Sequence, residues 1–432
     1  MKAFAPYLTE LRHLLSKRRE DPLFFQLAEQ AVNGQASSRL VSLVSTYGLK
    51  RTGAFFSSSL LSDNAASGLL GNQSHTPILV TDPACGAGNL LIAAAHRLPI
   101  RRNLTSTLEF WGQHLAGFDL HAEFVKATHL RLAILAISRG SSFDLEPSYR
   151  LERFFPNIRQ GDGLRELSSL KSVSHLLINP PFGPITAPKD CSWAQGKVTK
   201  AAVFFDRCLN LMLPNSHLSG ILPDVLRSGS RYQRWRQSIE NRAEILKITP
   251  AGNFETADVD VFHLDLKVRM KSAMPVLHGN WWTTPEVNDT VGGRFDTHVG
   301  AVVPHRLKKG EGPIYPFCHA KQLPFWGEFS PKEESVSFAG TVVRPPFVAI
   351  RRTSSPSDKF RALGTIILGD KPIAVENHLI VCRPKSGGLK ACKQLLSRLR
   401  LPATNSFLNQ RIRCRHLTVG VVKEIPWTKR QP

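Results

Sequence analysis

The residues from His175 to Gly183 read His-Leu-Leu-Ile-Asn-Pro-Pro-Phe-Gly and combine groups that could hold a planar amine. Such an amine is a poor nucleophile, because its lone pair is delocalised into the π system. The Asn179 side-chain oxygen and the Pro180 carbonyl could each accept one N–H, which draws the nitrogen toward tetrahedral geometry. Pro180 and Pro181 stiffen the loop and preorganise these acceptors. The segment therefore favours methyl transfer to an amino group.

Phe182 adds a ring on which a planar base could stack, a contact worth roughly 1–3 kcal/mol. The apolar run 176–178, ended by the double proline, predicts a buried parallel strand whose carboxyl end is at Asn179. An open α/β sheet binds its ligands at that end. A strand followed by a proline turn and a buried Phe would give the same four residues, so the tetrapeptide needs support from the rest of the chain.

That support begins at residues 78–95, where a β-branched apolar run passes through Asp-Pro-Ala-Cys-Gly-Ala-Gly into an Ala-rich helical stretch. The pattern predicts the first βα unit of a doubly wound sheet. Asp82, at the strand end, would lie near a cationic group such as the methionine ammonium of S-adenosylmethionine. Gly86 and Gly88 would let the backbone approach a ligand closely.

Two more acids follow at expected strand ends. Asp119 ends the run 115–119 and could accept both ribose hydroxyls of a nucleotide. It comes 37 residues after Asp82, more than the usual ~20, so residues 97–112 are expected to be an insertion or a long helix. Asp162 lies in Gly-Asp-Gly, usually a turn, but between Asp119 and Asn179 it could accept from an adenine amine.

Taken in this order, the motifs resemble those of gamma-type N6-adenine DNA methyltransferases of restriction–modification systems, which use S-adenosylmethionine. The resemblance implies a cofactor half before the catalytic half, no metal, and a target-recognition domain at the C-terminus. The element 51–57 is similar to the segment that closes over the methionine end of the cofactor in this family. Phe254 is similar in position to the residue that covers the far face of the base, although Phe254 would equally fit as a residue of the hydrophobic core. The implied catalytic residues are Asn179, Pro180, Pro181 and Phe182, the cofactor-binding residues are Phe56, Asp82, Pro83, Cys85, Gly86, Gly88, Asp119, Asp162 and Gly163, and the base-stacking residues are Phe182 and Phe254.

The fold expected is α/β, a doubly wound Rossmann-like methyltransferase sheet with a helical N-terminal leader and a smaller mixed α+β C-terminal domain. We expect the leader over 1–50, the methyltransferase domain over 51–271 and the basic target-recognition domain over 272–432. Within the second range, 184–200 reads as a loop beside the site, and the alternating run 259–266 suits an edge hairpin. In the third, strand-like runs occur at 299–303, 347–350, 365–368 and 379–382, with a helical stretch at 389–399.

The chain is strongly basic, with 56 Lys and Arg against 34 Asp and Glu, a net charge of +22 and a pI near 10. Residues 264–432 carry 27 basic and 12 acidic residues, a net +15, and the longer first part carries the remaining +7. This excess fits double-stranded DNA as the partner, although a solvated basic surface would look the same. Candidate phosphate contacts in the basic part are Arg351, Arg352, Lys359 and Arg361.

Seven cysteines, with no Cys-x-x-Cys pair, read as reduced thiols. The chain has no apolar run near 18 residues and no leader with a cleavage site, so we expect a cytoplasmic protein with no membrane partner.

The function implied is transfer of a methyl group from S-adenosylmethionine to N6 of adenine at specific DNA sites, by the modification enzyme of a restriction–modification or phage-defence system. No nuclease constellation is evident in the sequence. The first alternative is an RNA base amino-group methyltransferase, most naturally one acting on ribosomal RNA. A protein-glutamine methyltransferase would not need the basic third. The remaining alternative is a DNA-binding subunit that needs a partner for activity, so a specificity or nuclease subunit is a possible partner.

Overall fold

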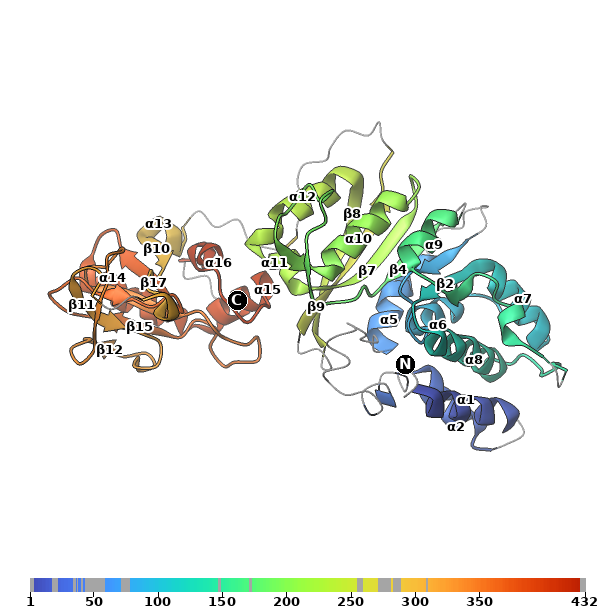
Figure 1. Ribbon diagram of the computed structural model, residues 1–432. Helices are drawn as coiled ribbons and strands as arrows, with labels where there is room; N and C mark the ends of the chain where they lie inside the picture. The colour runs from blue at the N-terminus through green and yellow to red at the C-terminus, as the bar shows by residue number, and fades with distance from the viewer. Residues whose placement is uncertain are drawn as a thin grey trace. The chain divides into compact units, whose positions relative to one another are not determined.

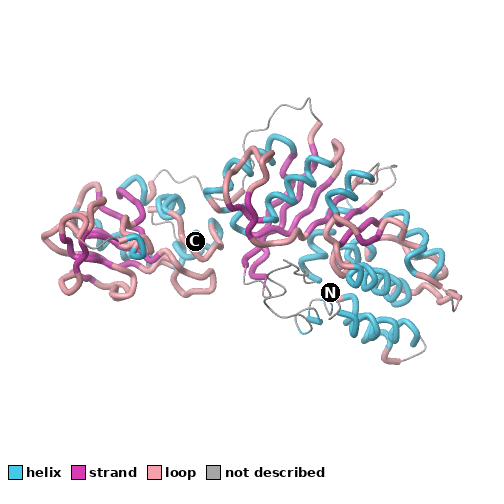
Figure 2. Tube along the Cα trace, in the orientation of Figure 1, coloured by secondary structure: helices cyan, strands magenta, loops and turns pink. Residues whose placement is uncertain are grey.

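The computed structural model describes residues 4–17, 22–33, 36, 38–39, 42, 59–70, 78–146, 149–170, 173–254, 259–270, 281–282, 289–307 and 310–427. Phe56 lies outside these residues. The chain forms two compact units, Met1–Arg227 with Arg231–Gly279 and Ser228–Ser230 with Asn280–Pro432. Both contain helices and strands (Figure 2).

The first unit is built on a seven-stranded sheet of order β3-β2-β1-β4-β7-β9-β8. β1, β2, β3, β4 and β7 are parallel, β9 is antiparallel to β7, and β8 is antiparallel to β9. The strand order reverses between β1 and β4, which confirms the expected α/β architecture with a largely parallel sheet. The strands are β1 (Val80–Asp82), β2 (Leu115–Asp119), β3 (Ile158–Gln160), β4 (His175–Ile178), β7 (His217–Pro223), β8 (Ala243–Phe254) and β9 (Val259–Val268).

The run 259–266 lies in a hairpin at the edge of the sheet, as expected. It forms β9, which pairs antiparallel with the edge strand β8 on one side and with β7 on the other. Val261, Phe262 and Leu264 of β9 are all buried.

Helices cover both faces of this sheet (Figure 1). α6 packs against β1, α8 against β2 and β3, and α5 against α6 and β7, while α10 packs against β7 and α9, and α12 against β8. Helices α1 and α2 pack on α8. The helices are α1 (Ala5–Lys17), α2 (Phe24–Val32), α5 (Ser59–Ala66), η2 (Ser67–Leu70), α6 (Asn89–Ala95), α7 (Leu104–His114), α8 (Ala122–Ser138), η3 (Leu151–Arg153), α9 (Gly163–Ser169), α10 (Lys200–Leu211), α11 (Asp224–Ser228), η4 (Ser230–Tyr232) and α12 (Gln233–Arg242).

The long connection between β1 and β2 contains a helix, which is one of the two outcomes, an insertion or a long helix, expected from the spacing of Asp82 and Asp119. α7 occupies residues 104–114 and runs directly into β2. Its N-cap is Asn103, whose side chain accepts a hydrogen bond from the Ser106 amide at 3.0 Å. The two cofactor-type acids can therefore lie on neighbouring strands despite the extra sequence.

The second unit contains a five-stranded sheet of order β10-β17-β14-β15-β12 and a three-stranded sheet of order β13-β11-β16. Two apolar cores occupy it, one built around Ile350 and Leu395 and the other around Phe347 and Val381. Its elements are α13 (Val291–Arg294), β10 (Phe295–Val299), η5 (Pro304–Arg306), β11 (Ile314–Cys318), β12 (Glu328–Phe329), β13 (Ser335–Ser337), β14 (Phe347–Arg351), β15 (Gly364–Ile367), β16 (Ala374–Val375), β17 (Leu379–Pro384), α14 (Gly388–Leu399), α15 (Pro402–Arg411) and α16 (Val419–Glu424).

The strand expected at 299–303 lies earlier, at β10, because Phe295 anchors it in the core opposite Pro384. Among the described residues of both units, no helix is long and apolar enough to span a membrane.

Candidate functional site

The predicted site residues follow the carboxyl ends of four adjacent parallel strands. Asp82 ends β1, Asp119 ends β2, Asp162 follows β3 by two residues, and Asn179 comes directly after β4. Asp82 is in register with Gly117, Asp119 with Gln160, and Thr81 with Leu176. The strand pairing therefore brings these side chains together at the carboxyl end of the sheet, beside the reversal of strand order where α/β proteins bind ligands.

The glycine loop after β1 is tied to β2 by hydrogen bonds. Cys85 N donates to Phe118 O at 2.9 Å, and Gly86 N donates to Asp119 Oδ2 at 3.1 Å. Gly88 has a φ of +87°, and a Cβ there would lie 2.6 Å from Thr128 Cγ2. This position needs glycine for both reasons, since other residues rarely adopt such a φ and have no room for a side chain.

Asp119 holds the loop and keeps capacity for a ligand. Its Oδ1 accepts from His121 N at 2.8 Å, and its Oδ2 accepts the Gly86 bond. Burial raises the pKa of this carboxyl. Because each carboxylate oxygen has two lone-pair directions, Asp119 can still accept ribose hydroxyls.

Asp82 is only 1% exposed, and its Oδ1 accepts from Ala84 N at 3.0 Å. Burial, with a further contribution from the charge of Asp119, raises the pKa of Asp82 to about 8. A cation beside a buried carboxyl stabilises its charged form and reverses such a shift. The site is therefore suited to a ligand that brings a positive group, and the methionine ammonium of S-adenosylmethionine is one.

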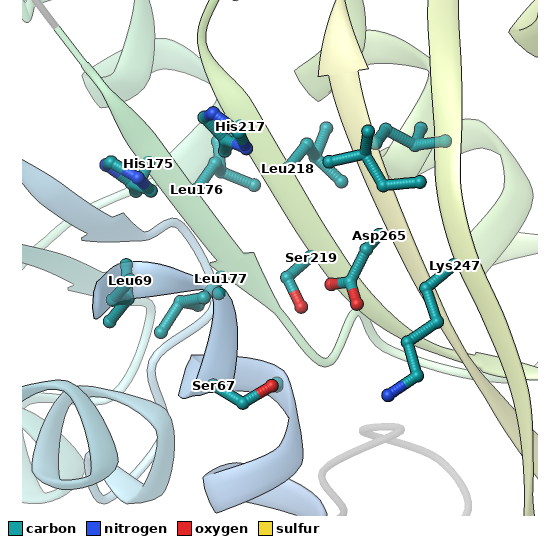
Figure 3. A pocket seen from close by; sticks show the side chains of 14 residues that line it. Ser67, Leu69, His175, Leu176, Leu177, His217, Leu218, Ser219, Lys247 and Asp265 are labelled. Carbon is teal, nitrogen blue, oxygen red and sulfur yellow. The ribbon is translucent and has the colours of Figure 1, made fainter. Parts of the chain in front are cut away.

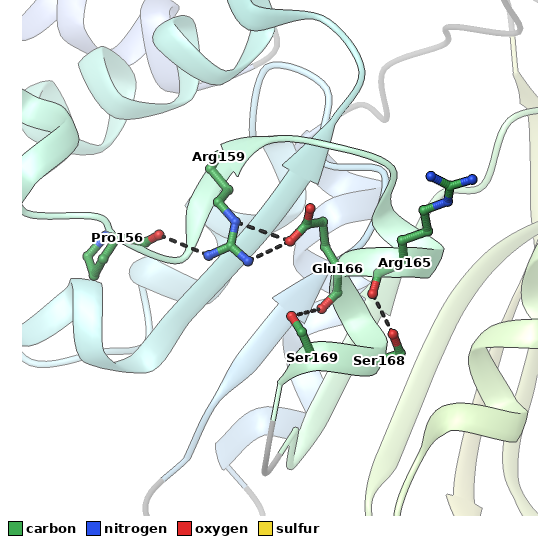
Figure 4. Close-up of polar contacts among 6 residues, drawn as sticks. All are labelled: Pro156, Arg159, Arg165, Glu166, Ser168 and Ser169. Atoms are coloured by element: carbon green, nitrogen blue, oxygen red, sulfur yellow. Dashed lines mark hydrogen bonds and ion pairs between the residues drawn. The ribbon is translucent and has the colours of Figure 1, made fainter.

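Gly163 fits close under the glycine loop, because a Cβ on it would lie 1.7 Å from Pro83 O. Asp162 is the N-cap of α9, where its Oδ1 accepts from Leu164 N at 3.1 Å and its Oδ2 lies 4.0 Å from Arg165 Nε. Figure 4 shows how α9 is fixed to β3: Arg159 donates to Glu166 Oε2 through Nη2 at 2.5 Å and Nε at 3.2 Å. The Pro83–Gly163 contact thus joins the loop after β1 to a helix secured by β3.

The Asn-Pro-Pro-Phe segment directly follows β4, with Asn179 partly exposed and Pro180 buried. Phe182 is only 6% exposed. The expectation that a base stacks on its ring therefore does not fit this conformation, in which neighbouring atoms already cover most of the ring. Phe254 ends β8, but its side chain lies outside what the structure describes.

Residues 184–200 were expected to form a loop, but they contain an antiparallel hairpin of β5 (Pro184–Thr186) and β6 (Lys197–Thr199). Lys200 N donates to Gly183 O at 2.8 Å, which closes the hairpin directly beside Phe182. Trp193, between the two strands, is buried. The sequence did not predict the hairpin, because the segment is polar and strands of three residues are too short to show an alternating apolar pattern.

Two residues of α8 that sequence reasoning missed also hold the glycine loop. Thr128 Oγ1 donates to Gly86 O at 3.2 Å, and Arg131 Nη1 donates to Ala87 O and, at 2.7 Å, to Asn89 Oδ1. A signal was available, since Arg131 interrupts the otherwise apolar run 130–137. A charged side chain in such a run needs polar partners inside the protein.

A separate cavity of about 350 Å³ lies at the amino ends of β4 and β7 (Figure 3). The rings of His175 and His217 stack there with centroids 5.1 Å apart. Burial and the neighbouring His217 lower the pKa of His175 to about 4. Ser219 Oγ lies 2.6 Å from His263 Nε2 on the same part of the sheet. None of the predicted site residues lines this cavity.

One candidate phosphate contact in the second unit is excluded by burial. Arg361 is 1% exposed and donates to the side chains of Ser354 and Asn409 and to the carbonyls of Ile412 and Cys414. These bonds make it a structural residue. Lys359 is exposed and remains available to a partner.

The sequence matches no protein-family model and no curated protein. Among solved structures, a Listeria monocytogenes protein assigned to the class I S-adenosylmethionine-dependent methyltransferases is similar at 18% identity, with a TM-score of 0.40 over 64% of this chain and 83% of that one. The M protein of the type I restriction enzyme EcoKI is 18% identical, with a TM-score of 0.35 over 54% of this chain and 46% of its own.

The type IIL restriction–modification enzyme MmeI, solved in complex with DNA, is 10% identical, with a TM-score of 0.52 over 90% of this chain and 70% of its own. At this identity the similarity concerns the fold alone. This chain therefore shares a fold with MmeI over most of its length.

Proposed function

We propose that this chain is an S-adenosylmethionine-dependent DNA methyltransferase that modifies N6 of adenine, as the modification enzyme of a restriction–modification or phage-defence system. One observation carries the proposal. The buried Asp82, the loop tied to Asp119 and the partly exposed Asn179 all stand at the carboxyl edge of one parallel sheet, on both sides of the reversal in strand order. Cofactor and amine would therefore meet at one edge.

In this proposal each acid binds a different part of the cofactor. Asp82 holds the methionine ammonium, Asp119 the ribose hydroxyls, and the second oxygen of Asp162 the adenine amine. The bound cofactor supplies an electrophilic methyl group on a sulfonium. Gly86 has no side chain and would let the loop backbone approach the cofactor closely, while Gly88 makes room for Thr128 on the other side of the loop.

Asn179 Oδ1 and the Pro180 carbonyl accept the two N–H groups of the target amine and direct its lone pair toward the methyl group. The nitrogen loses one proton to solvent after the new N–C bond has formed, so no general base is needed. Most of the rate would come from this positioning. Because Phe182 is largely covered, a base that stacks on it would first have to displace its neighbours.

The proposed partner is double-stranded DNA, from which the adenine is rotated at a cost of a few kcal/mol. The net charge of +22, most of it in the C-terminal part, supports this partner, as does the fold shared with an enzyme solved on DNA. Residues 272–432 would recognise the target, with Lys359 among the phosphate contacts. A specificity or nuclease subunit and a cytoplasmic location belong to the same proposal.

The test is transfer of labelled methyl from S-adenosylmethionine to unmethylated genomic DNA and, in parallel, to ribosomal RNA, with the product base identified by mass spectrometry. Asn179→Ala should abolish transfer while leaving cofactor affinity unchanged. Asn157→Ala is the matched control, because Asn157 is also partly exposed but precedes β3 at the amino end of the sheet. Label in RNA alone, or equal activity of Asn179→Ala, would refute the proposal.

A further inference from the structure

Arg131 lies in the middle of α8 and is completely buried, with 0% of its surface exposed. Its neighbours in the sequence, Leu130 and Leu132, are buried apolar residues. Burying a guanidinium is costly unless its N–H groups find acceptors inside the protein. The partners of Arg131 therefore show what this charge is used for.

Those partners come from two segments that are far apart in the sequence. Arg131 Nε donates to Ala31 O at 2.7 Å and Nη2 donates to Val32 O at 3.2 Å, both at the end of α2. On the other side, Nη1 donates to Asn89 Oδ1 at 2.7 Å and to Ala87 O. One side chain thus joins the C-terminus of α2 to the glycine loop.

Each end of this bridge suits a cation. The last carbonyls of a helix carry partial negative charge and have no intrahelical partner, so Arg131 caps α2. At the loop, Arg131 and Thr128 hold the successive carbonyls of Ala87 and Gly86 toward α8. Because C=O and N–H of a trans peptide point in opposite directions, the following amide of Ala87 is turned away from α8. Two side chains of α8 therefore fix the conformation of the glycine loop.

We propose that Arg131 is a positioning residue that couples the docking of α1 and α2 to the conformation of the cofactor loop. The N-terminal helices, which pack on α8, would then act on cofactor affinity without contributing a contact to the cofactor (Figure 1). Binding linkage is reciprocal, so the cofactor must stabilise the docked helices by the same factor. The cofactor part of this inference rests on the proposed function, but the clamp itself does not.

The experiment compares Arg131→Met and Arg131→Lys with the wild-type protein by calorimetry with S-adenosylmethionine and by hydrogen exchange. We expect the dissociation constant to rise between about 5- and 150-fold in Arg131→Met. Arg131→Lys should recover part of the affinity, because an ammonium restores some of the four bonds. In wild type, the cofactor should slow exchange in residues 24–32, and this slowing should be lost in Arg131→Met.

Arg139→Met is the matched control. Arg139, the C-cap of α8, lies about two turns beyond Arg131 and also donates to carbonyls, but these belong to Ala95 and Leu98 and not to α2 or the glycine loop. Thr128→Val is a second control, because the Thr128 hydroxyl bonds Gly86 O and Phe124 O and no carbonyl of α2. We expect it to weaken cofactor binding and to leave exchange in residues 24–32 unchanged.

The clamp can be tested even if the proposed function is wrong. Without any cofactor, Arg131→Lys should accelerate hydrogen exchange in both residues 24–32 and residues 85–89. Arg139→Met should not accelerate exchange in both of these segments. Acceleration in only one segment, or equal effects of the Arg139 variant, would overturn the inference. If the wild-type protein binds no S-adenosylmethionine but Arg131→Lys still accelerates exchange in both segments, only the proposed function would be refuted.

Discussion

Replacing Asp82 by Asn should make the folded protein more stable while weakening its cofactor binding. The pKa of Asp82 is raised from 3.8 to about 8, so at pH 7 the group is ionised in the unfolded chain but protonated in the folded one. The roughly three pH units between 3.8 and 7 correspond to about 4 kcal/mol of folding free energy. Asn is neutral in both states and its Oδ1 can still accept from Ala84 N, so Asp82→Asn should recover up to this amount.

The sign of the pH dependence follows from the raised pKa. Below pH 4 both states hold the proton, and the two proteins should be equally stable. From pH 4 to 8 the advantage of Asp82→Asn should grow by about 1.4 kcal/mol per pH unit. Hydrogen exchange of the β1 and β4 amides measures the stability difference between the two proteins for the first unit alone. The control is Asp190→Asn, since the Asp190 side chain is 77% exposed.

The same carboxyl makes cofactor binding a proton-releasing step. With a pKa near 8, about 0.9 of the Asp82 groups carry a proton at pH 7, and a bound ammonium would displace it. Calorimetry in two buffers with different ionisation enthalpies counts the released protons, which should fall to near zero in Asp82→Asn. An Asp82→Asn protein no more stable than wild type at pH 7, together with binding that releases no proton, would refute the reasoning.

Three further predictions concern other parts of the chain. Gly163→Ala should destabilise the first unit by several kcal/mol, because its Cβ would meet Pro83 O at 1.7 Å, whereas Gly68→Ala, with open space at the Cβ, should change thermal unfolding little. The stability of the wild-type protein relative to His175→Gln should fall by up to about 3 kcal/mol as the pH drops from 6.5 to 4, because the lowered pKa of His175 makes the unfolded state bind the proton first. Urea unfolding of both proteins over this pH range measures the difference, from which the opposite contribution of Asp82 cancels. Arg361→Met should destabilise the second unit in calorimetric scans, because the buried acceptors of Arg361 lose their donor. Lys359→Met should leave stability unchanged and reduce the slope of log affinity for DNA against log salt concentration by about one. The opposite pattern would restore Arg361 as a phosphate contact.

The sheet and the order of the site residues could be predicted because both are local properties of the sequence. Short apolar runs ending in Asp82, Asp119 and Asn179 identify parallel strands and mark their carboxyl ends. A simple count of residues between Asp82 and Asp119 predicted that an insertion or a long helix lies between them. Each inference needed only residues that lie close together in the chain.

The features that escaped prediction depend on contacts between distant segments. Arg131 lies about 100 residues from Ala31 and Val32, and no spacing rule connects them. The covering of Phe182 and the burial of Arg361 are likewise decided by packing around them.

The hairpin of β5 and β6 carries a feature that could report on the site directly. Of the seven cysteines, five are buried, and burial raises the pKa values of their thiols, to about 12 for Cys318, about 12 for Cys382 and about 11 for Cys392. Only Cys191 and Cys414 are partly exposed. A maleimide dye on a Cys414→Ser protein should therefore attach to Cys191, between β5 and β6. Its fluorescence would provide an optical signal from the hairpin that follows Asn-Pro-Pro-Phe, read in real time and without a radioactive methyl group.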